Sequence, residues 1–141
     1  MHSNFLLLTP KKLPTETEST SGVLFMKSDS NYVLQVSVYY QGDPIMCIGD
    51  KATLYLKATD GELLKVEDIV NSDADGIGSS IWNNSFLFRL SKEDLDFIRI
   101  RDFSILRIET DRSRVTSKIN PKMQGALSKL INVYFKVYKE G

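Results

Sequence analysis

The sequence is poor in the residues that most often carry out chemistry. Its 141 residues include one cysteine, Cys47, and one histidine, His2. A single cysteine excludes an intramolecular disulfide, and with one histidine it cannot form a zinc site of the usual Cys/His kind. A serine or cysteine nucleophile would have only His2, near the N-terminus, as its histidine base. We therefore expect no cofactor, and we expect that the protein is not an enzyme of these classes.

Long apolar runs are also missing. No run approaches the roughly 20 apolar residues that a membrane-spanning helix needs. The first apolar run, Phe5 to Leu8, is too short for the core of a signal peptide, and no lysine or arginine precedes it. We therefore expect a cytoplasmic protein without a membrane span.

The net charge is zero, because 18 lysines and arginines balance 18 acidic residues. No overall field therefore draws the protein toward nucleic acid or anionic lipid. The charge is nevertheless uneven: residues 1–72 hold 6 basic and 9 acidic side chains, whereas residues 73–141 hold 12 basic and 9 acidic ones. Every arginine lies between Arg89 and Arg114. This arginine cluster is the main candidate for a binding surface.

The composition that remains suits one globular domain, with 42% hydrophobic and 26% charged residues. Residues 9–22 are rich in Thr, Ser, Glu and Pro, and their few apolar side chains cannot offset the entropy lost on ordering. We predict a flexible N-terminal arm over residues 1–22 and one domain over residues 23–141. The run Phe5–Leu8 leaves an alternative, in which it adds a strand to a sheet edge of this chain or of a partner.

Alternating apolar residues predict strands along most of the domain. The clearest hairpin lies in the stretch ATLYLKATDGELLKV, which begins at Ala52. A three-residue loop, Thr59–Gly61, with its glycine left-handed, places Leu56 opposite Leu64 and makes one face apolar throughout. A two-residue loop would place Leu56 opposite a lysine. Because a slip of one residue would lose the apolar face, we predict the three-residue loop.

Two helices are expected. Ser91 is an N-cap with Asp94 three residues later, which predicts one short helix near 91–96. The alternation that follows predicts a strand with Arg99 and Arg101 on one face. At the C-terminus, Asn120 and the proline after it begin a helix with a broad apolar stripe.

These elements predict an α+β fold, in which an antiparallel β-sheet of about six to eight short strands packs against one C-terminal helix. Three segments carry a resemblance: LYLKATDGELLKV, FLFRLSKEDLDFI and ILRIET. Their order, with a Gly-rich loop after the hairpin, is similar to that in a family of small uncharacterised bacterial β-rich proteins. The resemblance covers residues 50–137, and it implies the fold without an activity or a site.

The stretch NSDADGIGSSIW, residues 71–82, is close to a calcium-binding loop. Asn71, Asp73 and Asp75 occupy positions 1, 3 and 5 of such a loop, and a glycine follows at position 6. Position 12, which should supply a bidentate carboxylate, is Trp82 and offers no oxygen. These three residues are therefore a weak calcium candidate, and we interpret the stretch as a connecting loop. Trp82 either anchors this loop to the core or belongs to a binding surface.

The arginines permit two interpretations. Arg99, Arg101 and Arg107 on neighbouring strands would give a sheet face that stacks and pairs with single-stranded nucleic acid. The acidic residues interleaved with them, such as Glu109, would alternatively turn the same face into a solvated surface of cross-strand pairs.

A non-catalytic protein-interaction or structural module is the preferred interpretation, with a protein partner or a homodimer as the expected complex. Its candidate contact residues are the three arginines together with Tyr39, Tyr55 and Trp82, because aromatic residues and arginine are enriched at interfaces. Nucleic-acid binding is the first alternative. A hydrolase that uses paired carboxylates is the second, since 18 acidic residues make a close pair arithmetically possible.

Overall fold

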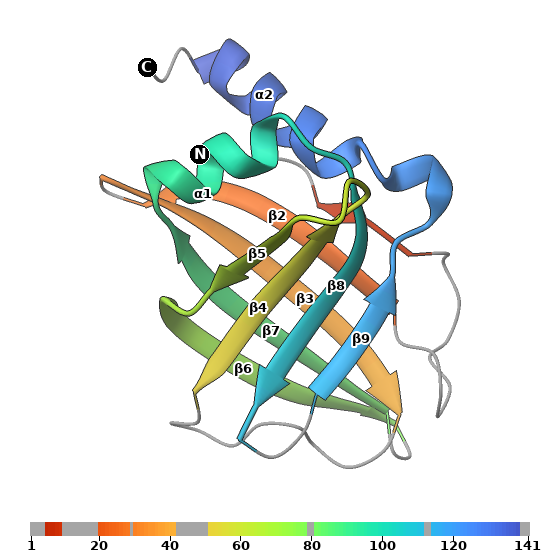
Figure 1. Cartoon of the computed structure of the whole chain (residues 1–141). Coiled ribbons are helices and arrows are strands. Elements are labelled where there is room, and N and C mark those ends of the chain that lie inside the picture. The colour runs from red at the N-terminus through yellow and green to blue at the C-terminus, as the bar shows by residue number, and fades with distance from the viewer. Residues whose placement is uncertain are drawn as a thin grey trace.

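The computed structural model describes residues 5–9, 20–28, 30–41, 51–78, 81–111 and 114–138. Within these residues the chain forms two antiparallel sheets, which face each other with three helical segments at one end (Figure 1). Sheet A contains, in spatial order, β1 (Leu6–Leu7), β2 (Thr20–Ser28), β3 (Asn31–Gln41), β7 (Ile81–Leu90) and β6 (Ile69–Gly78). Sheet B contains β5 (Leu63–Val66), β4 (Ala52–Ala58), β8 (Phe103–Thr110) and β9 (Arg114–Lys118). The helical segments are α1 (Lys92–Arg99), the 3-10 turn η1 (Pro121–Met123) and α2 (Ala126–Tyr138).

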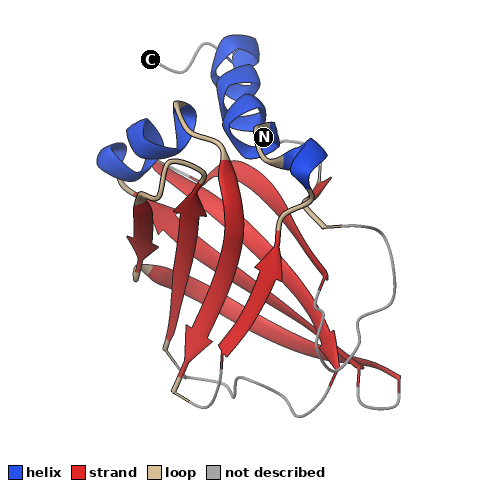
Figure 2. Ribbon diagram, turned by 45° about the vertical axis from the view of Figure 1, so that its right-hand side comes forward, coloured by secondary structure: helices blue, strands red, loops and turns tan. Residues whose placement is uncertain are grey.

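This architecture confirms the predicted α+β class. The finer arrangement differs from the prediction, because the described residues form nine strands in two sheets. The helices cover one end of the two sheets, which we call the helical end (Figure 2). Both sheets turn their apolar faces toward one continuous core. Each large side chain that is fully buried there contributes about 1.5 to 3 kcal/mol, so this shared core is the main source of stability.

The two sheets are joined where β5 continues into β6. Only Glu67 and Asp68 separate these strands, and the chain passes over them from sheet B to sheet A. The carbonyl of Asp68 accepts a hydrogen bond of 2.8 Å from the Arg89 amide of β7, so pairing in sheet A begins before β6 itself. The two sheets therefore share one bent edge.

On the opposite side, the N-terminal segment links the sheets. Leu6 and Leu7 pair with β2, and the buried Leu8 lies in the core. The carbonyl of Leu8 accepts a hydrogen bond of 2.9 Å from the amide of Asn120, just after β9. The run Phe5–Leu8 thus adds a strand to a sheet of its own chain, as the alternative from the sequence proposed. Of the predicted arm, residues 1–4 and 10–19 lie outside the described residues.

The predicted hairpin is confirmed in its register. Leu56 lies opposite Leu64 and Leu54 opposite Val66, and all four side chains are buried. The loop is closed by a 2.8 Å hydrogen bond from the amide of Ala58 to the carbonyl of residue 62. Its glycine, Gly61, has φ +91°, the left-handed value that the prediction required. The apolar alternation therefore selected the loop length correctly.

Along β3, Leu34, Val36, Val38 and Tyr40 occupy alternate positions and are buried. The buried face of sheet A also contains polar side chains, among them Ser21 on β2 and Asn84 on β7, which are both fully buried. The hydroxyl of Tyr40 donates a hydrogen bond of 2.6 Å to Asn84 Oδ1. A buried amide that lost this partner would carry its full cost of desolvation.

Replacing Gly61 tests the hairpin. A Cβ at this position meets no atom within 4 Å, so Gly61→Ala adds backbone strain without a clash. We expect the free energy of unfolding to fall by about 1 kcal/mol in urea titrations. Gly61→Asn, which tolerates a left-handed conformation better, should recover part of this loss. Equal losses in the two variants would contradict the explanation.

Two adjacent tyrosines test the buried hydrogen bond. Tyr40→Phe removes the donor to Asn84, and we expect a loss of about 1 to 2 kcal/mol in the free energy of unfolding. Tyr39→Phe is the matched control, because Tyr39 is only half-buried and lies on the other face of β3. Its loss should stay below about 0.5 kcal/mol. Similar losses for the two variants would show that the hydrogen bond is not the cause.

Candidate functional site

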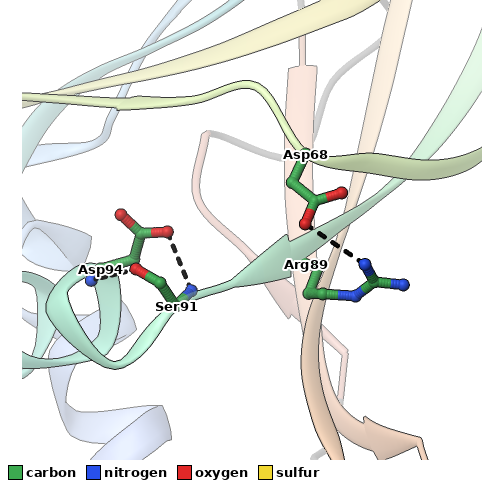
Figure 3. Close-up of polar contacts among 4 residues, drawn as sticks. All are labelled: Asp68, Arg89, Ser91 and Asp94. Atoms are coloured by element: carbon green, nitrogen blue, oxygen red, sulfur yellow. Dashed lines mark hydrogen bonds and ion pairs between the residues drawn. The ribbon is translucent and has the colours of Figure 1, made fainter.

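The arginine face predicted from the sequence is not formed, because the predicted strand around Arg99 is the end of a helix. The capping box is confirmed: the Asp94 amide donates to Ser91 Oγ at 3.1 Å, and the Ser91 amide donates to Asp94 Oδ2 at 3.0 Å (Figure 3). The helix that begins there runs to Arg99, beyond the predicted end near residue 96. Its buried residues, Leu95 and Ile98, follow a helical spacing, whereas Ile100 is 77% exposed. Helical packing has therefore overridden the short alternating pattern.

Arg99 joins the two helices. Its Nε donates a hydrogen bond of 2.6 Å to Asn132 Oδ1, and its guanidinium lies 4.6 Å from the centre of the Phe135 ring. The carbonyl of Arg99 in turn accepts hydrogen bonds from Ser128 Oγ at 2.8 Å and from Asn132 Nδ2 at 2.9 Å. These contacts satisfy the C-terminal end of α1 with side chains of α2. Arg99 is thus part of the contact between the helices.

Arg101, just after the end of α1, contacts Phe97 of this helix and Asp60 of the hairpin loop. Its guanidinium lies 3.9 Å from the centre of the Phe97 ring, and Nη1 donates to the Phe97 carbonyl at 3.3 Å. Its Nε also lies 3.4 Å from a carboxylate oxygen of Asp60, an ion pair without hydrogen-bond geometry. The side chain is only 25% exposed. Arg101 therefore connects α1 to the loop of the hairpin.

Arg107 is the only one of the three that lies on a strand. It belongs to β8, and its Nε donates a hydrogen bond of 2.9 Å to Thr116 Oγ1 on β9. The structure thus brings Arg99 and Arg101 to the helical end and leaves Arg107 on sheet B. The three arginines do not share a face.

The stretch predicted as a loop is mostly strand, which corrects the interpretation of residues 71–82. β6 runs to Gly78 and β7 begins at Ile81, and the two form a hairpin. Asn71, Asp73 and Asp75 occupy alternate positions of β6, so their Cα atoms extend over about 13 Å of strand. A calcium loop instead curves its ligands around one ion. The side chains of Asp73, Asp75 and Trp82 lie outside the described residues.

The predicted tyrosines lie apart. Tyr39 is on β3 in sheet A, and Tyr55 is on β4 in sheet B, where Lys65 Nζ lies 6.0 Å from the centre of its ring. Both side chains are half-buried. Since they belong to different sheets, they do not form one aromatic contact surface with the arginines.

Acidic side chains line a cleft at the end of sheet B away from the helices. The cleft has a volume of about 450 Å³, and its charged lining residues are Lys51, Glu67, Asp68, Glu109 and Asp111. Two of these carboxylates are engaged elsewhere. Asp68 lies 3.4 Å from Arg89 Nη1 (Figure 3), and Glu67 lies 3.6 Å from the ammonium group of Lys65. Within the described residues, no group of three or more His, Cys, Asp or Glu side chains is placed to hold a metal ion.

The helical end carries exposed apolar side chains on α2. Val133 and Val137 of α2 are 47% and 63% exposed, although valine is usually buried. Lys129 and Lys136 on the same helix are also exposed. The broad apolar stripe predicted for the C-terminal helix included its core residues, but it did not distinguish them from a second apolar series, to which Val133 and Val137 belong. A repeat of four, three and four residues from Ala126 to Val137 is the signal that would have separated them.

Comparisons with protein-family models, with curated proteins and with solved structures found no match. The resemblance to small bacterial β-rich proteins therefore remains a similarity of pattern. None of the helices in the described part of the chain has the length and hydropathy to cross a membrane.

The role assigned to Arg99 can be measured against Arg107. Arg99→Ala removes the hydrogen bond to Asn132 and the contact with the Phe135 ring, so we expect a loss of about 1 to 2 kcal/mol in the free energy of unfolding. Arg107→Ala, which removes one exposed hydrogen bond, should cost less than about 0.5 kcal/mol. If the two variants unfold alike in urea, Arg99 does not hold the helices together.

Proposed function

We propose that this protein is a non-catalytic interaction module that binds a protein partner through its helical end. The observation that carries the proposal is the exposure of Val133 and Val137 on α2. Neighbouring exposed apolar residues, bordered by polar ones, are typical of protein-binding surfaces.

The positions of the arginines also support this proposal over nucleic-acid binding. Arg99 and Arg101 are held by contacts inside the protein, and Arg107 lies away from them in sheet B. Binding of a single strand requires a continuous basic groove with aromatic stacking platforms. The surface that would have supplied this groove is divided between a helix and a sheet.

The open edge of sheet A is a poorer candidate for the interface than α2. β6 is the outermost strand of this sheet, and an unpaired edge can bind an extended segment of a partner. However, the pairing of β6 with β7 is irregular at two places, between Ile69 and Asn71 and between Gly76 and Gly78. Bulges and acidic residues such as those of β6 are devices that protect sheet edges from pairing. A helix-mediated contact is therefore favoured.

Photo-crosslinking in cells tests this function. A benzoylphenylalanine at position 133 should give a discrete protein adduct, because the partner covers α2. The matched control places the same residue at position 70, where Val70 is 47% exposed on β6. An adduct containing a second copy of the chain would identify a homodimer. Absence of an adduct at position 133, or equal adducts at both positions, would contradict the proposal.

A further inference from the structure

The side chains of α2 divide into three faces. Leu127, Ile131 and Tyr134 are buried in the core. Ser128 and Asn132 face α1, since both donate hydrogen bonds to the Arg99 carbonyl. Phe135 lies between these two faces, where its ring packs on Phe25 and on Arg99. With 3.6 residues per turn, a third side of the helix is turned away from α1. In Figure 2 this helix rises from the end of the two sheets.

The third face contains a second apolar series. Ala126, Leu130, Val133 and Val137 are separated by four, three and four residues. This is the spacing of a helix that packs along another helix, because it keeps one narrow seam of side chains facing the partner. Leu130 is partly buried against the core, while Val133 and Val137 project from the surface. The series is therefore an exposed helix-packing seam, which we call the α2 seam.

The two borders of the α2 seam differ. One border is formed by Leu127 and Tyr134, which belong to the core. The other is formed by Lys129 and Lys136, which are exposed, and within the described residues neither makes an ion pair. In paired helices the residues beside the seam select the partner by charge. The α2 seam thus presents one charged border, and this border is basic.

Basic residues predominate in the sequence before and within α2, and Glu140 is the first acidic residue after it. Residues 112–139 contain seven basic residues and no acidic one. An antiparallel copy of α2 would set Lys129 and Lys136 against the same two lysines, and like charges across a seam oppose pairing. A partner helix with acidic residues at its border would instead form attractive pairs.

The apolar part of the surface also favours a helix over a lipid bilayer. Helices that lie in a membrane surface bury a broad apolar face that is rich in leucine, phenylalanine and tryptophan. The α2 seam exposes two valines and one partly buried leucine, and the core occupies the rest of the apolar side of the helix. A seam this narrow has the width that one partner helix covers when it packs along α2.

We propose that the α2 seam, with Lys129 and Lys136, binds an acidic amphipathic helix of a partner protein. The inference rests on the proposed function, and it specifies the partner's chemistry. Apolar side chains of the partner cover Val133 and Val137, and its glutamates or aspartates pair with the two lysines.

The test uses the full chain and two synthetic helix-forming peptides of about 20 residues. Both peptides carry leucine at the four- and three-residue spacing, and they differ only in having glutamate or lysine beside the leucines. Fluorescence anisotropy should detect binding of the glutamate peptide and at least about tenfold weaker binding of the lysine peptide. Binding of the glutamate peptide should weaken as the salt concentration rises. Equal binding of the two peptides, or no binding of either, would overturn the proposal.

Charge reversal gives the decisive variant. Lys129→Glu together with Lys136→Glu should weaken binding of the glutamate peptide about tenfold or more and should strengthen binding of the lysine peptide. The matched control reverses Lys57 and Lys118, which are exposed on sheet B and change the net charge equally. Val133→Ser together with Val137→Ser should weaken binding of both peptides. Circular dichroism checks that every variant is folded. A charge-reversed protein that behaves like the control would overturn the proposal.

Two further measurements, vesicle cosedimentation and cellular crosslinking, distinguish the acidic helix from a membrane surface and from a different protein partner. Cosedimentation with phosphatidylserine–phosphatidylcholine vesicles that depends on Lys129 and Lys136, without discrimination between the peptides, would overturn the acidic helix in favour of a membrane surface. A cellular adduct at position 133 that survives the Lys129→Glu and Lys136→Glu changes would overturn the acidic helix but leave the interaction module intact. The loss of that adduct in the charge-reversed protein supports both.

Discussion

The structure depends on the short connection from β5, at the edge of sheet B, to β6, at the edge of sheet A. At Glu67 and Asp68 the chain leaves sheet B and enters sheet A, and the Asp68 carbonyl is already paired with the Arg89 amide. This bent edge forces the apolar faces of both sheets to share one core, which the Leu8–Asn120 hydrogen bond joins on the opposite side. Neither sheet alone could bury its apolar face, so the two are stable only together.

The shared core also determines which surfaces remain available. The helices cover one end of the sheets, and α2 uses one face for the core and another for α1. Arg99 and Arg101 are taken up in fastening α1 to α2 and to the hairpin loop. The basic residues that stay free of such contacts on α2 are lysines, and they lie beside exposed valines. The proposed interface therefore consists of side chains of α2 that the packing of the core and of α1 leaves exposed.

Local patterns predicted the elements in which sequence neighbours determine the conformation. The Gly61 loop followed from the need to keep one apolar face, and the Ser91–Asp94 capping box depends on residues three positions apart. The stretch from Asn71 to Gly78 was missed as a strand, because its glycines and aspartates lower the intrinsic preference for a strand. It is a strand because the long β7 offers it a paired partner. β9 likewise pairs along a longer strand, β8.

The sequence by itself determined the α+β class, the register of the hairpin, the start of α1 and the apolar face of the last helix. Each follows from spacing within about ten residues, where backbone geometry and turn chemistry act directly. Only the tertiary structure decided where the arginines lie and which apolar residues stay exposed. Arg99 sits against Asn132, and Val133 faces outward beside it, because packing of α1 on α2 selects one side of each helix. Contacts between residues so distant in sequence depend on the whole core, which no local pattern encodes.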